Sequence, residues 1–153
     1  SAVNRWKRRK MMFEIIKLAI IIFALTVNSV SDVKKRKISL GIIGILFAGG
    51  VLFRIYDKTL VSFDTLYCLI PGVLTILLSF VSKGSVGLGD ALMILSLGLY
   101  MKANEILSVI MVAVTLAGIV ALVCVTVLKK GRKYELPFIP FLYIGFVVVR
   151  CII

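Results

Sequence analysis

The sequence contains no histidine, and this absence excludes several kinds of catalytic site. Without histidine, neither a Ser-His nor a Cys-His nucleophile system can form. Cysteine is scarce as well: Cys68, Cys124 and Cys151 lie singly inside apolar runs, and none belongs to the close pairs that bind zinc. We therefore expect no metal site and no cofactor, and we interpret the cysteines as small core side chains.

Acidic residues are also few. The chain has seven acidic and nineteen basic residues, which gives a net charge of +12. In a soluble protein, such an excess would suggest nucleic-acid binding. Here the basic residues fall in short segments between apolar runs, where they set the orientation of a membrane protein and meet anionic headgroups. We therefore expect a lipid bilayer as the partner of this surface, and no nucleic acid.

Long apolar runs dominate the rest of the chain, which is 61% hydrophobic with a mean hydropathy of +1.11. The runs are continuous rather than alternating, which favours helices over strands. They are roughly 14 to 23 residues long, and a full span needs about 20 residues. We predict an all-α polytopic membrane protein with six transmembrane helices, of which the second, fourth and sixth are short. The six segments are Met11–Val30, Ile38–Phe53, Leu60–Val81, Leu88–Met101, Ile106–Leu128 and Phe138–Ile153.

The first apolar run has a rival interpretation, because its basic start, "RWKRRK", resembles that of a secretory signal peptide. The apolar stretch is long, however, and no A-x-A site follows it, so an uncleaved first helix is favoured. Residues 1–10 are expected to form a basic N-terminal segment, with Ser1–Val3 interpreted as a cloning remnant. Glu14 and Lys17 are three residues apart and are expected to pair. The whole chain, 1–153, is expected to be one six-helix domain.

The chain has only four aspartates, and charged residues near a bilayer are candidates for function. Asp57 and Asp64 lie in "RIYDKTLVSFD", where we interpret them as solvated loop charges. Asp32 ends the first segment and Asp90 begins the fourth. Two crossings separate them, so both are expected at the same membrane face. Each has a simpler explanation: Asp32 could pair with its basic neighbours, and Asp90 could be stabilised by a helix dipole.

Basic residues are distributed unequally between the two faces, and their distribution predicts the orientation. The loops on the aspartate face carry nine, against four on the opposite face, which makes the aspartate face cytoplasmic. Five further basic residues before the first helix argue the other way. The basic residues on the aspartate face are Lys34, Lys35, Arg36, Lys37, Lys83, Lys129, Lys130, Arg132 and Lys133. Those on the opposite face are Arg54, Lys58, Lys102 and Arg150. Those before the first helix are Arg5, Lys7, Arg8, Arg9 and Lys10.

Two carboxyl groups in one site have a recognised chemistry. Like charges at close range cannot both ionise cheaply, so the pair shares a proton. One carboxylate then draws a proton from water while the other donates to a scissile carbonyl. The "GLG" before Asp90 supports a peptide substrate, because Gly87 and Gly89 would permit the close approach of an extended chain. A transporter that uses Asp32 and Asp90 as ion or proton ligands is an alternative.

Three motifs resemble those of type IV prepilin leader peptidases, a family of GxGD membrane aspartic peptidases. They are "GLGD" (Gly87–Asp90), the stretch Asp32–Ile38 and "ELPFIPFL" (Glu135–Leu142). The resemblance implies that Asp32 and Asp90 are catalytic, and that Gly87, Gly89, Pro137 and Pro140 are motif or substrate-binding positions. It also implies that the substrates are prepilins or pseudopilins, cut after a short basic leader at the cytoplasmic face of the inner membrane.

The chain also departs from that family's pattern. Ser39-Leu40 stands where the family usually has Pro-Asn, and Leu92 where it usually has lysine. The chain lacks the cysteine-paired insert of larger bacterial members, so the resemblance implies a minimal form with the peptidase half and no methyltransferase or zinc domain. A catalytically inactive pilus-assembly scaffold stays an alternative. The presenilin-like class is disfavoured because no late Pro-Ala-Leu element is present. Glu135 could offer a counter-charge to a basic leader, although a helix-start acid is the simpler interpretation.

Overall fold

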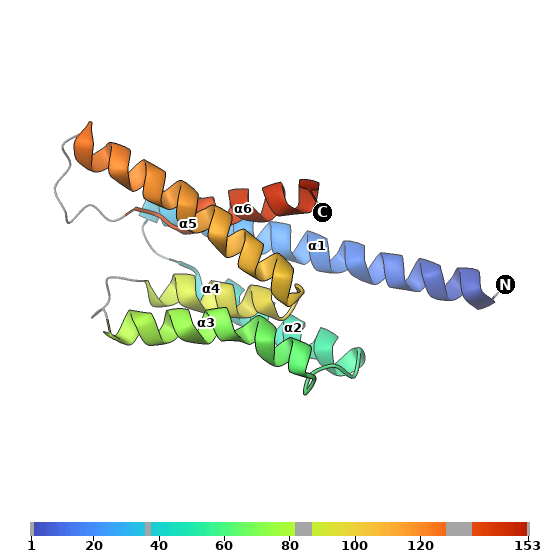
Figure 1. Ribbon diagram of the computed structural model, residues 1–153. Helices are drawn as coiled ribbons and strands as arrows, with labels where there is room; N and C mark the ends of the chain where they lie inside the picture. Colours follow the sequence, from blue (N-terminus) through green and yellow to red (C-terminus); the bar gives the residue numbers. More distant parts are fainter. Residues whose placement is uncertain (1, 36–37, 82–86, 128–135, 153) are drawn as a thin grey trace.

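The computed structural model describes residues 2–35, 38–81, 87–127 and 136–152, which form six helices and no strand. The predicted all-α class is confirmed. Figure 1 shows the helices running side by side in a bundle, with successive helices pointing in opposite directions. The helices are α1 (Ala2–Lys35), α2 (Leu40–Tyr56), α3 (Phe63–Val81), α4 (Leu88–Gly98), α5 (Ala103–Thr126) and α6 (Ile139–Ile152).

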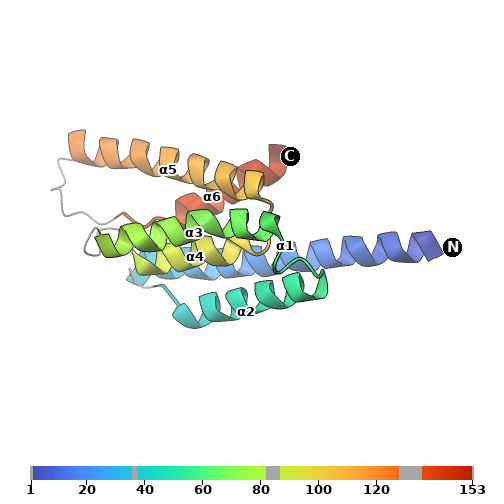
Figure 2. The same ribbon diagram turned by 60° about the horizontal axis from the view of Figure 1, so that its bottom comes forward.

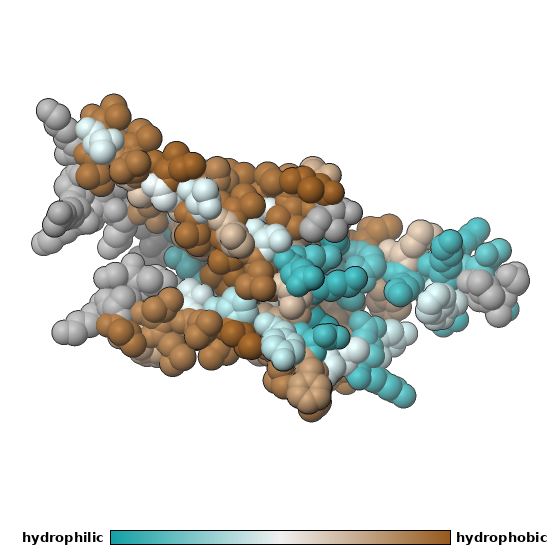
Figure 3. All heavy atoms as spheres, in the orientation of Figure 1, coloured by the Kyte–Doolittle hydropathy of each residue, from teal (hydrophilic) through white to brown (hydrophobic). Residues whose placement is uncertain are grey.

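Helix α1 is longer than the apolar run that predicts it. It begins at Ala2 rather than near Met11, so most of the basic N-terminal segment is helical. At 1.5 Å per residue, its 34 residues extend about 51 Å, well beyond a hydrocarbon core of about 30 Å. The excess length projects past the other helices, as Figures 1 and 2 both show. Figure 3 shows hydrophilic side chains on this projecting part.

Helix lengths and the exposed surface identify a polytopic membrane protein. Helices α1, α3 and α5 are long and apolar enough to cross a membrane, while α2, α4 and α6 are shorter apolar helices. The prediction that the second, fourth and sixth segments are short is thereby confirmed. Large apolar side chains such as Phe80 and Met111 are exposed, and Figure 3 shows apolar groups over the outer surfaces of α3 and α5. In a bilayer these surfaces face lipid.

The shortest helix, α4, lies at the centre of the bundle. It contacts α2, α3 and α5, and its side chains are buried on several sides, including Ala91, Met93 and Leu97, none of which is exposed at all. An apolar sequence on every face is what such a position requires. The burial of α4 fixes the place of its first turn, which carries Asp90.

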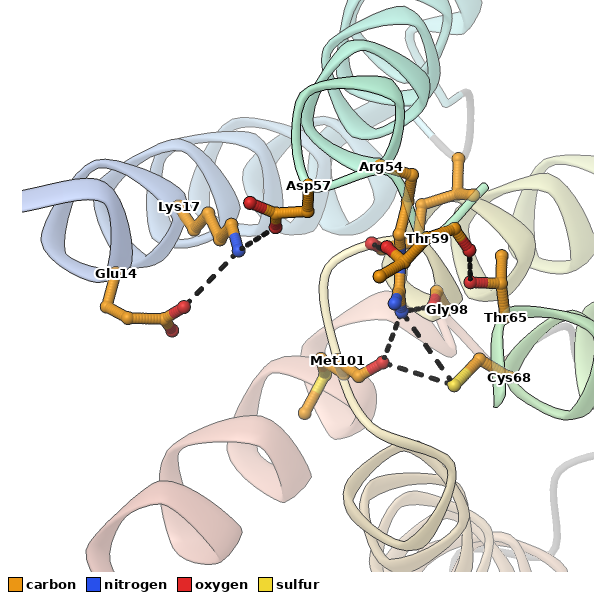
Figure 4. A network of polar contacts seen from close by, with 10 residues as sticks. Glu14, Lys17, Arg54, Asp57, Thr59, Thr65, Cys68, Gly98 and Met101 are labelled. Atoms are coloured by element: carbon orange, nitrogen blue, oxygen red, sulfur yellow. Dashed lines mark hydrogen bonds and ion pairs between the residues drawn. The ribbon is translucent and has the colours of Figure 1, made fainter. Parts of the chain in front are cut away.

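A polar cluster lies at the end of the bundle opposite Asp90, and Figure 4 shows it. Arg54 of α2 donates from Nε to the Leu99 carbonyl (2.8 Å), and from Nη2 to the carbonyls of Met101 (3.1 Å) and Gly98 (3.4 Å). The last carbonyls of a helix have no partner within it, so Arg54 caps the C-terminus of α4. The interpretation of Arg54 as a residue of an outer loop is wrong, because Arg54 lies in the last turn of α2.

The predictions for the acidic residues near this cluster are confirmed for their pairing and exposure, but not for the position of Asp64. The Lys17 ammonium pairs with Glu14 (3.2 Å), which confirms the expected pair, and also with Asp57 (3.4 Å). Asp57 and Asp64 are exposed as expected, but Asp64 lies in the first turn of α3 rather than in a loop.

The three cysteines do not share one environment. Cys68 and Cys124 are buried, as the sequence interpretation expects. Cys151 is exposed, so its interpretation as a core side chain was wrong. It lies next to the last residue of α6.

Candidate active site

Asp32 lies in the last turn of α1 and is fastened to the beginning of α6. Its side chain is buried, with the residue 8% exposed. Its Oδ2 accepts a hydrogen bond from the Ile139 backbone N–H (3.2 Å), and the Phe138 backbone N–H also interacts with this carboxylate. The first N–H groups of a helix have no partner within it and attract negative charge. Asp32 therefore caps α6 from a different helix and is held in one orientation.

Two prolines surround the donors that hold Asp32. Pro137 precedes Phe138, and Pro140 follows Ile139 as the second residue of α6. Proline has no N–H to donate and is tolerated in the first turn of a helix. The "PFIP" stretch thus leaves the N–H groups of Phe138 and Ile139 as the donors between the two prolines, and both are directed to Asp32.

Asp90 occupies the first turn of α4, directly after the glycine-rich stretch. Gly87 is the N-cap of this helix, with extended backbone angles (φ −62°, ψ 126°), and its carbonyl accepts from the N–H groups of Asp90 (3.1 Å) and Ala91 (3.2 Å). The Oδ1 atom of Asp90 is buried and has no hydrogen-bond partner among the described residues. Buried polar atoms are nearly always paired, so a carboxylate oxygen without a partner marks a candidate reactive group.

The fold brings the two carboxyl groups to one site. The C-terminus of α1 and the N-terminus of α4 lie at the same end of the bundle in both ribbon views. The two side chains are close enough to interact electrostatically. Asp32 and Asp90 come from positions 58 residues apart in the chain, so their meeting is a product of the helix packing.

The two motif glycines occupy different surroundings. A Cβ atom at Gly89 would lie 2.6 Å from Cδ1 of Ile38, so the missing side chain admits a residue of the α1–α2 connection. A Cβ atom at Gly87 would lie 3.0 Å from Oδ2 of Asp90, so this glycine leaves space beside the carboxylate. The backbone of Gly87 is not left-handed, so any residue could adopt its angles. What the glycine provides is the absence of a side chain beside the Asp90 carboxylate.

Sequence reasoning missed Asn28, which lies one turn before Asp32 on α1. It is completely buried. Its Nδ2 donates to the Ala24 carbonyl (3.1 Å), and its Oδ1 accepts from the Ser39 backbone N–H (3.0 Å). The available signal was an amide side chain four positions before Asp32, in the helical segment that carries it. Ser39 stands where the resembled motif has proline, which could not donate this bond.

A comparison with protein families decides the identity of the chain. The model of the type IV leader peptidase family matches residues 19–122. The chain belongs to this family. The matched span contains both Asp32 and Asp90 and ends before the "PFIP" stretch. Neither the curated proteins nor the solved structures gave a significant match.

Membership identifies a type IV leader peptidase-like membrane protease at the level of the family. Some of the sequence predictions fall on parts of this leader peptidase that the structure does not describe. Glu135 lies outside the described residues, as do most of the basic residues counted on the aspartate face. The expected counter-charge role of Glu135 therefore stays a prediction.

Proposed function

We propose that this protein is an aspartic endopeptidase of the inner membrane that removes the leader peptide of type IV prepilins or pseudopilins. Asp32 and Asp90 would form its catalytic pair, within one six-helix domain that comprises residues 1–153. The observation that carries the proposal is the electrostatic interaction of two carboxyl groups from distant helices, with Oδ1 of Asp90 buried and without a hydrogen-bond partner among the described residues. Membership of the type IV leader peptidase family supports the same reaction class.

The proposed reaction needs one proton on the pair. The ionised carboxylate takes a proton from water while the water oxygen bonds to the scissile carbonyl carbon, and the protonated carboxyl donates to the carbonyl oxygen. The tetrahedral intermediate then breaks its C–N bond: the leaving amine receives a proton from one carboxyl group, while the other carboxylate takes a hydroxyl proton from the intermediate, so the pair again holds one proton. The pair titrates as a unit, so neither role is assigned to one aspartate. The hydrogen bond from the Ile139 N–H to Oδ2 orients Asp32 for this work.

The location of the pair suits a substrate that is itself a membrane helix. The helix ends that carry the two aspartates, the last turn of α1 and the first turn of α4, lie at one end of the bundle, where a segment just outside the helix of a prepilin would arrive. The space that Gly87 leaves beside Oδ2 of Asp90 suits an extended backbone. The excess of basic residues in the loops at this end supports a cytoplasmic location, where leaders would be exposed.

Cleavage of prepilins in isolated membranes tests the proposal. Membranes that contain the protein are incubated with a panel of prepilins, and the product masses are measured. We expect at least one prepilin to lose its leader, and no cut within its apolar helix. If no prepilin is shortened, the proposal fails, and a transporter or an inactive pilus-assembly scaffold becomes the favoured interpretation.

Labelling tests the orientation separately. Val33 is exposed beside Asp32, so Val33→Cys in a chain without its natural cysteines gives one accessible thiol at the aspartate face. A membrane-impermeant maleimide should leave this thiol unlabelled in intact cells and label it in inverted vesicles. Labelling in intact cells would place the aspartates outside and contradict the proposed cytoplasmic site.

A further inference from the structure

The buried amide of Asn28 connects the parts of the protein that carry the two aspartates. We propose that Asn28 is a positioning residue, which sets the approach of Asp90 to Asp32 through Ser39 and Ile38. The positioning itself is a property of the fold, whereas its effect on turnover rests on the proposed function.

Two hydrogen bonds fix the orientation of the Asn28 side chain. Asn28 and Asp32 are four residues apart, so they lie on the same face of α1. The Asn28 Nδ2 is tied to the Ala24 carbonyl (3.1 Å) within the same helix. This bond directs the amide oxygen away from its own helix, towards the backbone N–H of Ser39 (3.0 Å). Asn28 is completely buried, so water does not compete for either bond.

Ser39, which donates one of these bonds, stands at the beginning of α2. It is the N-cap of α2, with an extended backbone (φ −76°, ψ 96°), and its carbonyl accepts the first bond of that helix from Ile43 (3.2 Å). The bond from Asn28 therefore fixes where α2 begins relative to the end of α1. No side chain of the described residues caps α2 at this point, so the Asn28 bond is the local constraint.

Ile38 connects the α1–α2 junction to the first turn of α4, which carries Asp90. Ile38 precedes Ser39 and reaches into the space that Gly89 leaves, where its Cδ1 would lie 2.6 Å from an added Cβ atom. Gly89 is the residue before Asp90 in the first turn of α4. A continuous series of contacts thus runs from Asn28 to Ser39, and from Ile38 to Gly89 beside Asp90. Loss of the Asn28 bond releases Ile38 and with it the lateral support of this turn.

A cross-linking measurement tests the positioning without any need for activity. The natural cysteines are replaced, Asp32→Cys and Asp90→Cys are introduced, and the rate of bridging by a short bis-maleimide is measured in membranes. We expect Asn28→Leu to slow bridging about 10-fold or more, because effective concentration depends steeply on geometry.

Two further variants keep the test decisive. Ser96→Ala is the matched control, because Ser96 is also buried, at 1% exposed, and among the described residues its side chain bonds within its own helix, to the Leu92 carbonyl (2.8 Å). It should leave the bridging rate unchanged. Ser39→Pro removes the N–H while the φ of −76° already suits proline. In the Ser39→Pro background, Asn28→Leu should slow bridging no further, since both changes remove the same bond.

Kinetics then connect the positioning to turnover. If the proposed peptidase reaction is right, Asn28→Leu should lower kcat about 100-fold, with little change in KM, because the aspartates rather than the substrate are displaced. Unchanged bridging in a folded Asn28→Leu protein would overturn the inference. Slowed bridging in a protein that cuts no prepilin would uphold the positioning and reject the proposed function.

Discussion

Replacing Gly145 by alanine tests whether the close packing of α5 and α6 is as tight as the structure shows. A Cβ atom at Gly145 would lie 2.7 Å from the Val109 carbonyl oxygen and 3.3 Å from the Ala113 backbone nitrogen. Both neighbours belong to the backbone of α5, so neither can rotate away. Reaching an ordinary contact of 3.4 Å would require the two helices to separate by about 0.7 Å at this point. Overpacking of this kind costs about 1–3 kcal/mol.

Gly118 provides the matched control, because a Cβ atom there would have nothing within 4 Å. Both glycines lie inside helices, so the gain in helix propensity on changing to alanine, about 0.5–1 kcal/mol, is common to the two variants. The difference between them isolates the packing cost. We expect Gly118→Ala to stabilise the protein slightly, and Gly145→Ala to be less stable than Gly118→Ala by about 1–3 kcal/mol.

Thermal unfolding in detergent can measure this difference. Cys68 and Cys124 are buried, so a thiol-reactive dye reports unfolding once the exposed Cys151 has been changed to serine. The Gly145→Ala protein should unfold at a lower temperature than the Gly118→Ala protein. It should also cleave more slowly, because α6 begins with the Ile139 N–H that holds Asp32. Equal unfolding temperatures for the two variants would refute the packing argument.

Three further predictions concern other contacts. Arg54→Lys should lower the free energy of unfolding by about 2 kcal/mol in the same assay, because an ammonium cannot reproduce the guanidinium fork that bonds three carbonyls; an unchanged midpoint would contradict the cap. A double-mutant cycle on Lys17 and Asp57 should give a coupling of less than about 1 kcal/mol, because the pair is partly exposed; a larger value would show a desolvated pair. Gly89→Ala should slow cleavage and Ile38→Val should partly restore it, because valine lacks the Cδ1 atom in closest contact; a failure of rescue would place the effect elsewhere.

Much of the fold follows from the sequence, because long apolar runs separated by charges predict helices and their alternating direction. The same alternation predicts that Asp32 and Asp90 lie at one end. The beginning of α1 was not predicted, because hydropathy ends a segment at charged residues whereas lysine and arginine are good helix formers. The helix therefore continues through the basic segment to Ala2.

The partners of the site residues could not be predicted, because they depend on contacts between segments far apart in the chain. The Ile139 donor lies 107 residues from Asp32, and no local pattern connects the two. The bond from Asn28 to Ser39 requires the geometry of the α1–α2 junction. The local sequence around Arg54 is typical of a loop charge, and its partner, the Leu99 carbonyl at the end of α4, lies 45 residues away in the chain. In each case the local sequence shows the polar group, and only the packing shows what it binds.

The most direct measurement for the account as a whole compares leader cleavage by Asp32→Asn, Asp90→Asn and Asp57→Asn with that of the unchanged protein. Asparagine keeps an oxygen that can accept from Ile139, so Asp32→Asn should still fold. Asp57 is exposed at the opposite end, so its variant controls for the loss of a charge. We expect the rate of leader cleavage to fall by at least about 100-fold in Asp32→Asn and Asp90→Asn, and to be unchanged in Asp57→Asn. Cleavage at an undiminished rate by a folded Asp32→Asn or Asp90→Asn protein would contradict the catalytic pair.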